Sequence, residues 1–259
     1  MSIAFRTHPA LVAYLTCGDP DLRTTRDVAL AAIDAGAEVI ELGVPFSDPV
    51  ADGPVIQRAS ERALRNGVSL EQVLGLAKDI RKKTDAGLIV FSYLNPIMRM
   101  GLQRFAEEAA SAGVDGALVT DLPVEESDEY LRVMRKQNLA SVFLAAPTST
   151  DQRLKRIAET STGFIYAISR TGITGARKDL TDDAQQLVKR LRKFTDLPIA
   201  VGFGISSAEH FKAVGKFADA AVVGSAIVHT IEQNPGKEPQ AVAEWIKQVV
   251  GRRSSAVSP

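Results

Sequence analysis

The chain has 259 residues, of which 45% are hydrophobic and 24% are charged, and these values are typical of a folded globular protein rather than a disordered one. Its 31 basic and 31 acidic residues cancel, which excludes recognition of nucleic acid or an anionic membrane through net charge. The single cysteine, Cys17, cannot form an intrachain disulfide and suits a reducing compartment. Because no apolar run has the length of a signal peptide or a membrane span, we expect a cytoplasmic protein.

Short apolar runs alternate with helix-like stretches along the chain. Eight runs have the length of a strand: 11–16, 38–43, 87–93, 116–121, 141–147, 163–169, 198–204 and 220–226. Each run is almost continuously apolar, which is typical of parallel strands that are buried on both faces. The pattern therefore predicts repeated β/α units.

The segments between these runs carry helix signals. Residues 23–36 end in Ala-Gly, a pattern typical of a helix C-cap. Ser206 and Ser207 predict a capped helix start after the seventh run. The last predicted helix, 240–250, places Trp245 on its apolar face, so we expect this side chain to pack in the core.

Eight β/α units predict an α/β fold, a single (β/α)₈ TIM barrel over residues 1–259 with a short N-terminal segment. An open doubly wound sheet is the alternative, although it would normally show fewer strands. The polar tail 251–259 is expected to be frayed. The connections after the second and sixth runs are the longest, and in this barrel the active site lies in such loops.

Two carboxylates follow the second run. Glu41 interrupts an apolar strand, where a carboxylate must be paired or face a polar cavity. The Pro- and Asp-rich loop after it can return Asp52 over the barrel mouth, and two converging carboxylates are the parts of an acid/base pair. The structural alternative is an internal salt bridge for Glu41 and an Asx-turn between Asp52 and Gly53.

Glycines at the ends of later runs predict a phosphate site. The loop 169–177 contains two glycines, Gly204 ends the seventh run, and Gly224 with Ser225 ends the eighth. Loops after the last two strands and a helix N-terminus form the common phosphate site of this barrel. Backbone N–H groups and the Ser225 hydroxyl would hold the anion without many cations.

The residues that several other reaction mechanisms would require are missing from the expected positions in the sequence. No lysine lies in the eight runs, as a Schiff-base aldolase would need. The three histidines (His8, His210 and His229) are far apart in the sequence, so no metal site is predicted. The site is therefore expected to work with carboxylates and without a cofactor.

The segment 41–54, ELGVPFSDPVADGP, resembles the signature of the tryptophan synthase alpha subunit family. Further matching segments follow the family order: 14–20, 121–123, 169–175, 202–206 and 224–226. The resemblance extends from about Ala10 to about Val250. It implies retro-aldol cleavage of indole-3-glycerol phosphate to indole and glyceraldehyde 3-phosphate in L-tryptophan biosynthesis.

The resemblance also implies a role for each matched residue. Glu41 would transfer protons, and Asp52 would bond the indole N–H. The phosphate-binding positions would be Gly175, Gly204, Gly224 and Ser225. The substrate pocket would contain Tyr14, Tyr93, Tyr166 and Thr174, the last of these in the loop that closes on Asp52.

Asp48 and Pro49 match the loop that meets the beta subunit, so the resemblance implies an alpha2-beta2 heterotetramer with pyridoxal phosphate only in the beta partner. Two alternatives stay open: a stand-alone indole-3-glycerol-phosphate lyase, and a non-catalytic phosphate-binding subunit that activates a partner. Family members commonly carry a helix before the first strand. Its absence here predicts exposed apolar surface at the bottom of the barrel.

Overall fold

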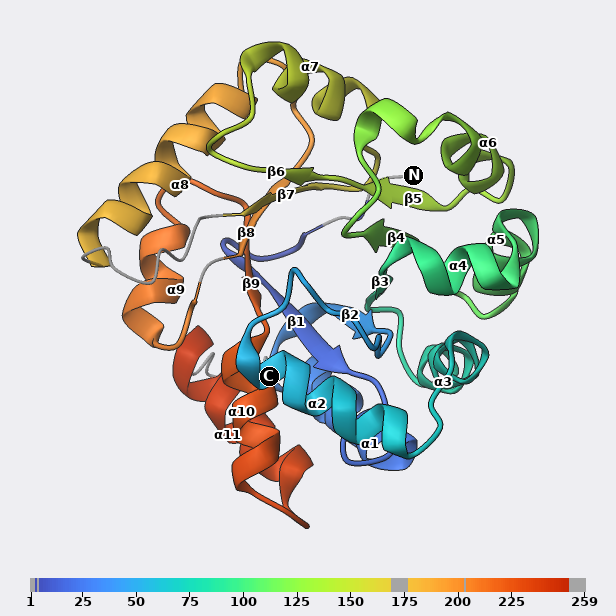
Figure 1. The fold of residues 1–259 in the computed structure, drawn as a ribbon. Coiled ribbons are helices and arrows are strands. Elements are labelled where there is room, and N and C mark those ends of the chain that lie inside the picture. Colours follow the sequence, from blue (N-terminus) through green and yellow to red (C-terminus); the bar gives the residue numbers. More distant parts are fainter. Residues whose placement is uncertain (1–2, 4, 169–176, 203, 252–259) are drawn as a thin grey trace, which may run out of the picture.

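The computed structural model describes residue 3 and residues 5–168, 177–202 and 204–251, without the side chains of 177–181. Among these residues nine strands form one sheet in the order β5-β4-β3-β2-β1-β9-β8-β7-β6. All of their pairings are parallel. The sheet curves into a barrel that the helices surround (Figure 1). This arrangement confirms the predicted TIM barrel.

The two strands at the ends of that order are one stretch of chain. β5 (Ala140–Val142) pairs with β4, β6 (Leu144–Ala145) pairs with β7, and only Phe143 separates them. The predicted fifth run, 141–147, is therefore two short strands. Inward and outward side chains still alternate through it, because the backbone changes its partner and not its direction. This change of partner closes the barrel.

The other strands follow the predicted runs, the first two beginning one residue earlier and the rest being shorter: β1 (Ala10–Thr16), β2 (Ala37–Gly43), β3 (Gly87–Ser92), β4 (Gly116–Val119), β7 (Ile165–Ile168), β8 (Ile199–Gly202) and β9 (Ala220–Val223). The helices around them are α1 (Leu22–Ala35), α2 (Pro54–Arg65), α3 (Leu70–Arg81), α4 (Leu94–Met100), α5 (Leu102–Ser111), α6 (Asp128–Lys136), α7 (Asp151–Thr160), α8 (Arg177–Leu191), α9 (Ala208–Val214), α10 (Ser225–Gln233) and α11 (Glu238–Val250), with a 3-10 turn η1 (Val124–Glu126).

The predicted helix ends agree with the local geometry. Gly36 ends α1 with a φ of 121°, in the region that favours glycine. The side chain of Ser207 caps α9 by accepting a bond from the N–H of His210. Trp245 packs partly buried against the main core, as expected. No helix of the described ranges is long and apolar enough to cross a membrane. The predicted frayed tail lies outside the described residues from position 252 onward.

The described residues before β1 reach the bottom of the barrel. Ile3 is buried in the cluster that fills the barrel interior, and Phe5 packs against Phe164 with ring centroids 5.8 Å apart. Ile3 also lies close to Gly87, which begins β3. At this position, where exposed apolar surface was expected, the side chains of Ile3 and Phe5 cover the interior cluster.

Candidate active site

Glu41 lies in the middle of β2, in register with Tyr14 of β1 and Ile89 of β3. Its side chain is 0% exposed, and neither carboxylate oxygen has a hydrogen-bond partner among the described residues. Burial raises the pKa of this carboxyl to about 8. The salt bridge considered as an alternative is absent from the described part of the chain. Glu41 is therefore a buried acid that holds its proton at neutral pH.

Asp52 lies in the loop between β2 and α2. The hydroxyl of Tyr93 donates to Asp52 Oδ2 at 3.2 Å, and the N–H of Ala51 donates to the same hydroxyl at 3.0 Å. The ring of Tyr93 stacks on Phe46 with centroids 4.9 Å apart. Burial raises the pKa of Asp52 to about 6, while the bond from Tyr93 lowers it. The Asp52 side chain thus bonds to Tyr93, and this bond brings two predicted site residues together.

Tyr14 and Tyr166 complete the surroundings of the two carboxylates. Burial raises the pKa of both phenols well above the ordinary value, and the charges of Asp52 and Glu41 raise it further. Each tyrosine therefore lies within electrostatic reach of both acids. Tyr14 also meets Phe91 edge to face, with centroids 5.1 Å apart. The five predicted side chains (Tyr14, Glu41, Asp52, Tyr93 and Tyr166) belong to one region of the barrel.

Two glycines at strand ends leave room for these tyrosines. A Cβ at Gly43, the last residue of β2, would overlap the phenol ring of Tyr14. A Cβ at Gly202, the last residue of β8, would lie 2.7 Å from Cζ of Tyr166. Any side chain at these positions would displace a ring. This role was not predicted from the sequence, although a glycine that ends an apolar strand is a signal for close approach.

Thr16 was also missed. It lies two residues after Tyr14 on β1, so the strand alternation turns both side chains to the barrel interior. Its hydroxyl is buried beside the Tyr14 phenol and lowers the pKa of that phenol, although no hydrogen bond of ordinary geometry joins the two groups. The alternation from Tyr14 could have identified it from the sequence.

The predicted phosphate positions lie at the start of α10 and after β8. Gly224 is the N-cap of α10 and Ser225 is its first, exposed residue. The first N–H groups of a helix have no acceptor within it, so they attract an anion. A Cβ at Gly224 would lie 3.5 Å from Cβ of Tyr14, which places the helix start beside the tyrosine. Gly204 is exposed after β8, whereas Thr174 and Gly175 lie outside the described residues.

The predicted partner loop is at the surface. Asp48 is exposed and accepts a bond from the hydroxyl of Ser47 at 2.6 Å, while Pro49 is half-buried. Val50 beside them is 86% exposed, which is unusual for a large aliphatic side chain. The loop thus presents apolar surface next to Asp52, although its role as an interface stays a prediction.

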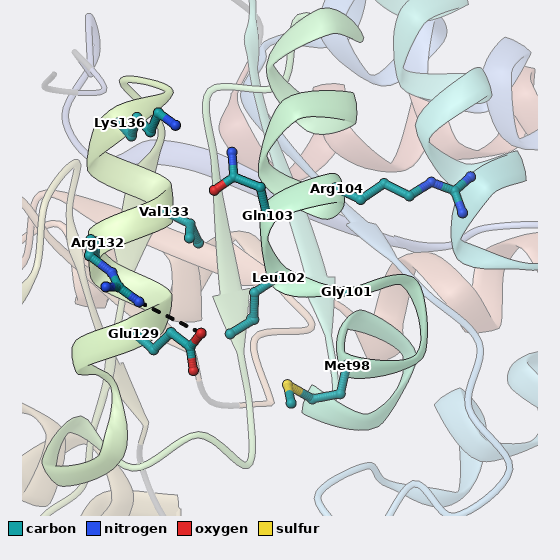
Figure 2. A pocket seen from close by; sticks show the side chains of 9 residues that line it. All are labelled: Met98, Gly101, Leu102, Gln103, Arg104, Glu129, Arg132, Val133 and Lys136. Carbon is teal, nitrogen blue, oxygen red and sulfur yellow. Dashed lines mark ion pairs between the residues drawn. The ribbon is translucent and has the colours of Figure 1, made fainter.

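A separate hollow of about 670 Å³ lies on the outer surface, between α6 and the connection from α4 to α5. Figure 2 shows its lining, which includes Met98 and Lys136 and the ion pair between Glu129 and Arg132, 3.7 Å apart. None of the predicted site residues lines it. The hollow is therefore distinct from the site at the barrel mouth. The described residues also contain no group of three His, Cys, Asp or Glu side chains that could hold a metal ion.

Comparison with known proteins gives close relatives. The family model described as "Tryptophan synthase alpha chain" matches residues 2–257. The tryptophan synthase alpha chain of Solibacter usitatus is 53% identical over 225 residues, which cover 87% of this chain and 84% of the relative. That of Neisseria meningitidis serogroup B is 48% identical over 241 residues, which cover 93% and 92%.

Solved structures agree with these relatives. A tryptophan synthase complex from Pyrococcus furiosus contains a chain that is 38% identical, with a TM-score of 0.87 over 95% of this chain and 99% of that one. A structure of the tryptophan synthase a2b2 complex from the same organism gives 40% identity and a TM-score of 0.89 over the same shares. Because the family model spans nearly the whole sequence and the relatives match it at about half their positions, this chain belongs to the tryptophan synthase alpha chain family.

Proposed function

We propose that this chain is the alpha subunit of tryptophan synthase, a lyase that cleaves indole-3-glycerol phosphate to indole and glyceraldehyde 3-phosphate in L-tryptophan biosynthesis. The observation that carries the proposal is the buried Glu41, which has no partner among the described residues and lies within reach of the same tyrosines as Asp52. A scaffold has no use for an unpaired buried acid, because its desolvation costs stability.

The two carboxylates have pKa values that suit different steps. With a pKa of about 8, Glu41 is protonated at neutral pH and can deliver a proton to C3 of the indole ring. The positive charge that then develops at N1 is stabilised by Asp52, which is ionised above a pKa of about 6. As the C–C bond breaks and its electrons return to the ring, the Glu41 carboxylate accepts the proton of the glycerol hydroxyl. Glu41 ends the cycle protonated, as it began.

The phosphate end of the substrate belongs at the start of α10. Gly224 and Ser225 offer backbone N–H groups and a hydroxyl there, and Gly204 lies after the preceding strand. Gly175 and Thr174 would act from the loop after β7, on the strength of the family pattern alone. Tyr14, Tyr93 and Tyr166 would flank the indole ring.

The family also supports a partner. The Pyrococcus furiosus relatives form a tryptophan synthase complex, so we propose an alpha2-beta2 assembly in which Asp48, Pro49 and the exposed Val50 meet the beta subunit. Pyridoxal phosphate would be held only by that subunit. A cytoplasmic location and a single barrel domain over residues 1–259 complete the proposal.

The experiment is cleavage of indole-3-glycerol phosphate by the purified chain, alone and with a tryptophan synthase beta subunit, followed by indole release. The Glu41→Gln variant tests the acid, and Glu107→Gln, which changes an exposed glutamate of α5, is the control. Slow cleavage that rises with the beta subunit and disappears only in Glu41→Gln is expected. Fast cleavage without the partner would favour the stand-alone lyase, and no cleavage in either condition would refute the lyase proposal.

A further inference from the structure

Four charged side chains connect three separate parts of the barrel mouth. Arg58 and Arg62 lie one turn apart on α2, Glu232 lies near the end of α10, and Asp19 lies in the loop after β1. Arg58 donates to Glu232 at 2.8 Å, and Arg62 donates to Glu232 at 2.9 Å. Arg62 also donates to both oxygens of Asp19, at 2.7 and 2.8 Å. We call these four residues the α2–α10 network.

The α2–α10 network is stronger than an ordinary surface ion pair. Asp19 is only 3% exposed, and its two carboxylate oxygens accept a bidentate pair of hydrogen bonds from the guanidinium group of Arg62. Glu232 bonds to two guanidinium groups, and its hydrogen bond from Arg58 holds the pKa of this carboxyl well below its ordinary value. Because Arg62 is shared by two carboxylates, it connects α2 to α10 and to the loop after β1.

The two helices that the network joins are anchored very differently. They lie side by side, and both contact β1 (Figure 1). The side chains that α2 buries are small (Ala59, Ser60 and Ala63), and its larger Val55 and Ile56 are only partly buried beside Tyr14. Those that α10 buries are large and aliphatic: Ile227 and Ile231 belong to the main core, and Val228 packs in a cluster with Tyr14 and with Ala59 of α2. Since apolar burial scales with area, α10 is held by its own core contacts and α2 depends more on the α2–α10 network.

Both helices begin at the candidate site. α2 starts two residues after Asp52, and the side chain of Gln57 donates to the backbone carbonyl of Asp52 at 2.9 Å. α10 starts at Gly224 and Ser225, the predicted phosphate positions. A shift of α2 therefore moves Asp52, whereas the phosphate end stays with α10.

We propose that Glu232 and Arg62 are positioning residues, which hold α2 on α10 so that Asp52 reaches the ring of a substrate whose phosphate lies at the first turn of α10. The inference rests on the proposed function. Neither residue touches the substrate. Both act through the placement of α2.

The test compares Glu232→Gln with Glu108→Gln, which removes a single pair with Arg104 at 2.6 Å on the far helix α5. For each variant kcat, KM, the inhibition constant of inorganic phosphate and Tm are measured. Glu232→Gln is expected to lower kcat about tenfold, because small misplacements of a catalytic group are costly. The phosphate inhibition constant is expected to stay within about twofold, since α10 keeps its own core anchors. The control variant is expected to keep the wild-type kcat.

Hydrogen exchange gives a readout without activity, and Glu232→Gln is expected to lower protection of the α2 amides while α10 keeps its protection. The milder substitution Arg58→Gln removes a half-exposed partner of Glu232 and keeps the ion pair between Arg62 and Glu232. A smaller loss of kcat is therefore expected.

Three results would overturn the inference: an unchanged kcat in Glu232→Gln, a parallel loss of kcat and phosphate affinity, or unchanged protection of α2. A wild-type chain without lyase activity would instead refute the proposed function, and catalytic positioning with it.

Discussion

Replacement of Glu41 by Gln removes the buried acid while almost keeping its shape. The carboxyl is 0% exposed, has no cation or donor beside it among the described residues, and has a pKa raised from 4.5 to about 8. The amide cannot ionise. We therefore expect Glu41→Gln to lower kcat about 10²–10⁴-fold, the usual contribution of a positioned acid/base group. We also expect the variant to have a larger free energy of unfolding than wild type.

The gain in stability follows from proton linkage. The folded chain binds the Glu41 proton more tightly than the unfolded chain, so the free energy of unfolding falls as the pH rises from 4.5 to about 8. The cost is about 1 kcal/mol at pH 5 and about 3 kcal/mol at pH 7, and it levels off at about 5 kcal/mol above the folded pKa. The variant escapes this cost at every pH.

The assay is urea unfolding of wild type and Glu41→Gln across the range from about pH 5 to about pH 8.5, with the exposed Glu107→Gln as control. The stability difference between Glu41→Gln and wild type should widen steadily with pH, while the control should follow wild type. A difference that does not change with pH would refute the reasoning, because it would mean that Glu41 is not held neutral by burial.

Four further outcomes are expected. Asp52→Asn should lower kcat about 10²–10⁴-fold. Tyr93→Phe should move the acid limb of the pH profile of kcat to higher pH, because the Tyr93 hydroxyl lowers the pKa of Asp52. An unmoved limb would contradict the hydrogen bond between Tyr93 and Asp52. Ser225→Ala should raise KM and leave kcat nearly unchanged, which steady-state kinetics would check. Gly202→Ala should cost about 1–3 kcal/mol in a denaturant titration, because its Cβ overlaps the ring of Tyr166, and an undisturbed variant would count against this packing.

The local sequence pattern was sufficient to predict the fold and to identify Glu41 as the acid. Eight apolar runs separated by capped helices specify a parallel barrel, because strand and helix periods are properties of neighbouring residues. Glu41 was recognisable for the same reason, since one carboxylate in an apolar strand conflicts with its surroundings. The residues of the loop after β7, including Thr174 and Gly175, stay sequence predictions.

Only the tertiary structure decided how the site is assembled. The hydroxyl of Tyr93 reaches Asp52 across 41 positions of sequence, and Arg58 reaches Glu232 across 174. No local pattern encodes such contacts, because they depend on which strands become neighbours when the barrel closes at Phe143. The raised pKa of Glu41 has the same origin. The sequence places a carboxylate on a strand, but only the closed barrel buries that carboxylate away from solvent.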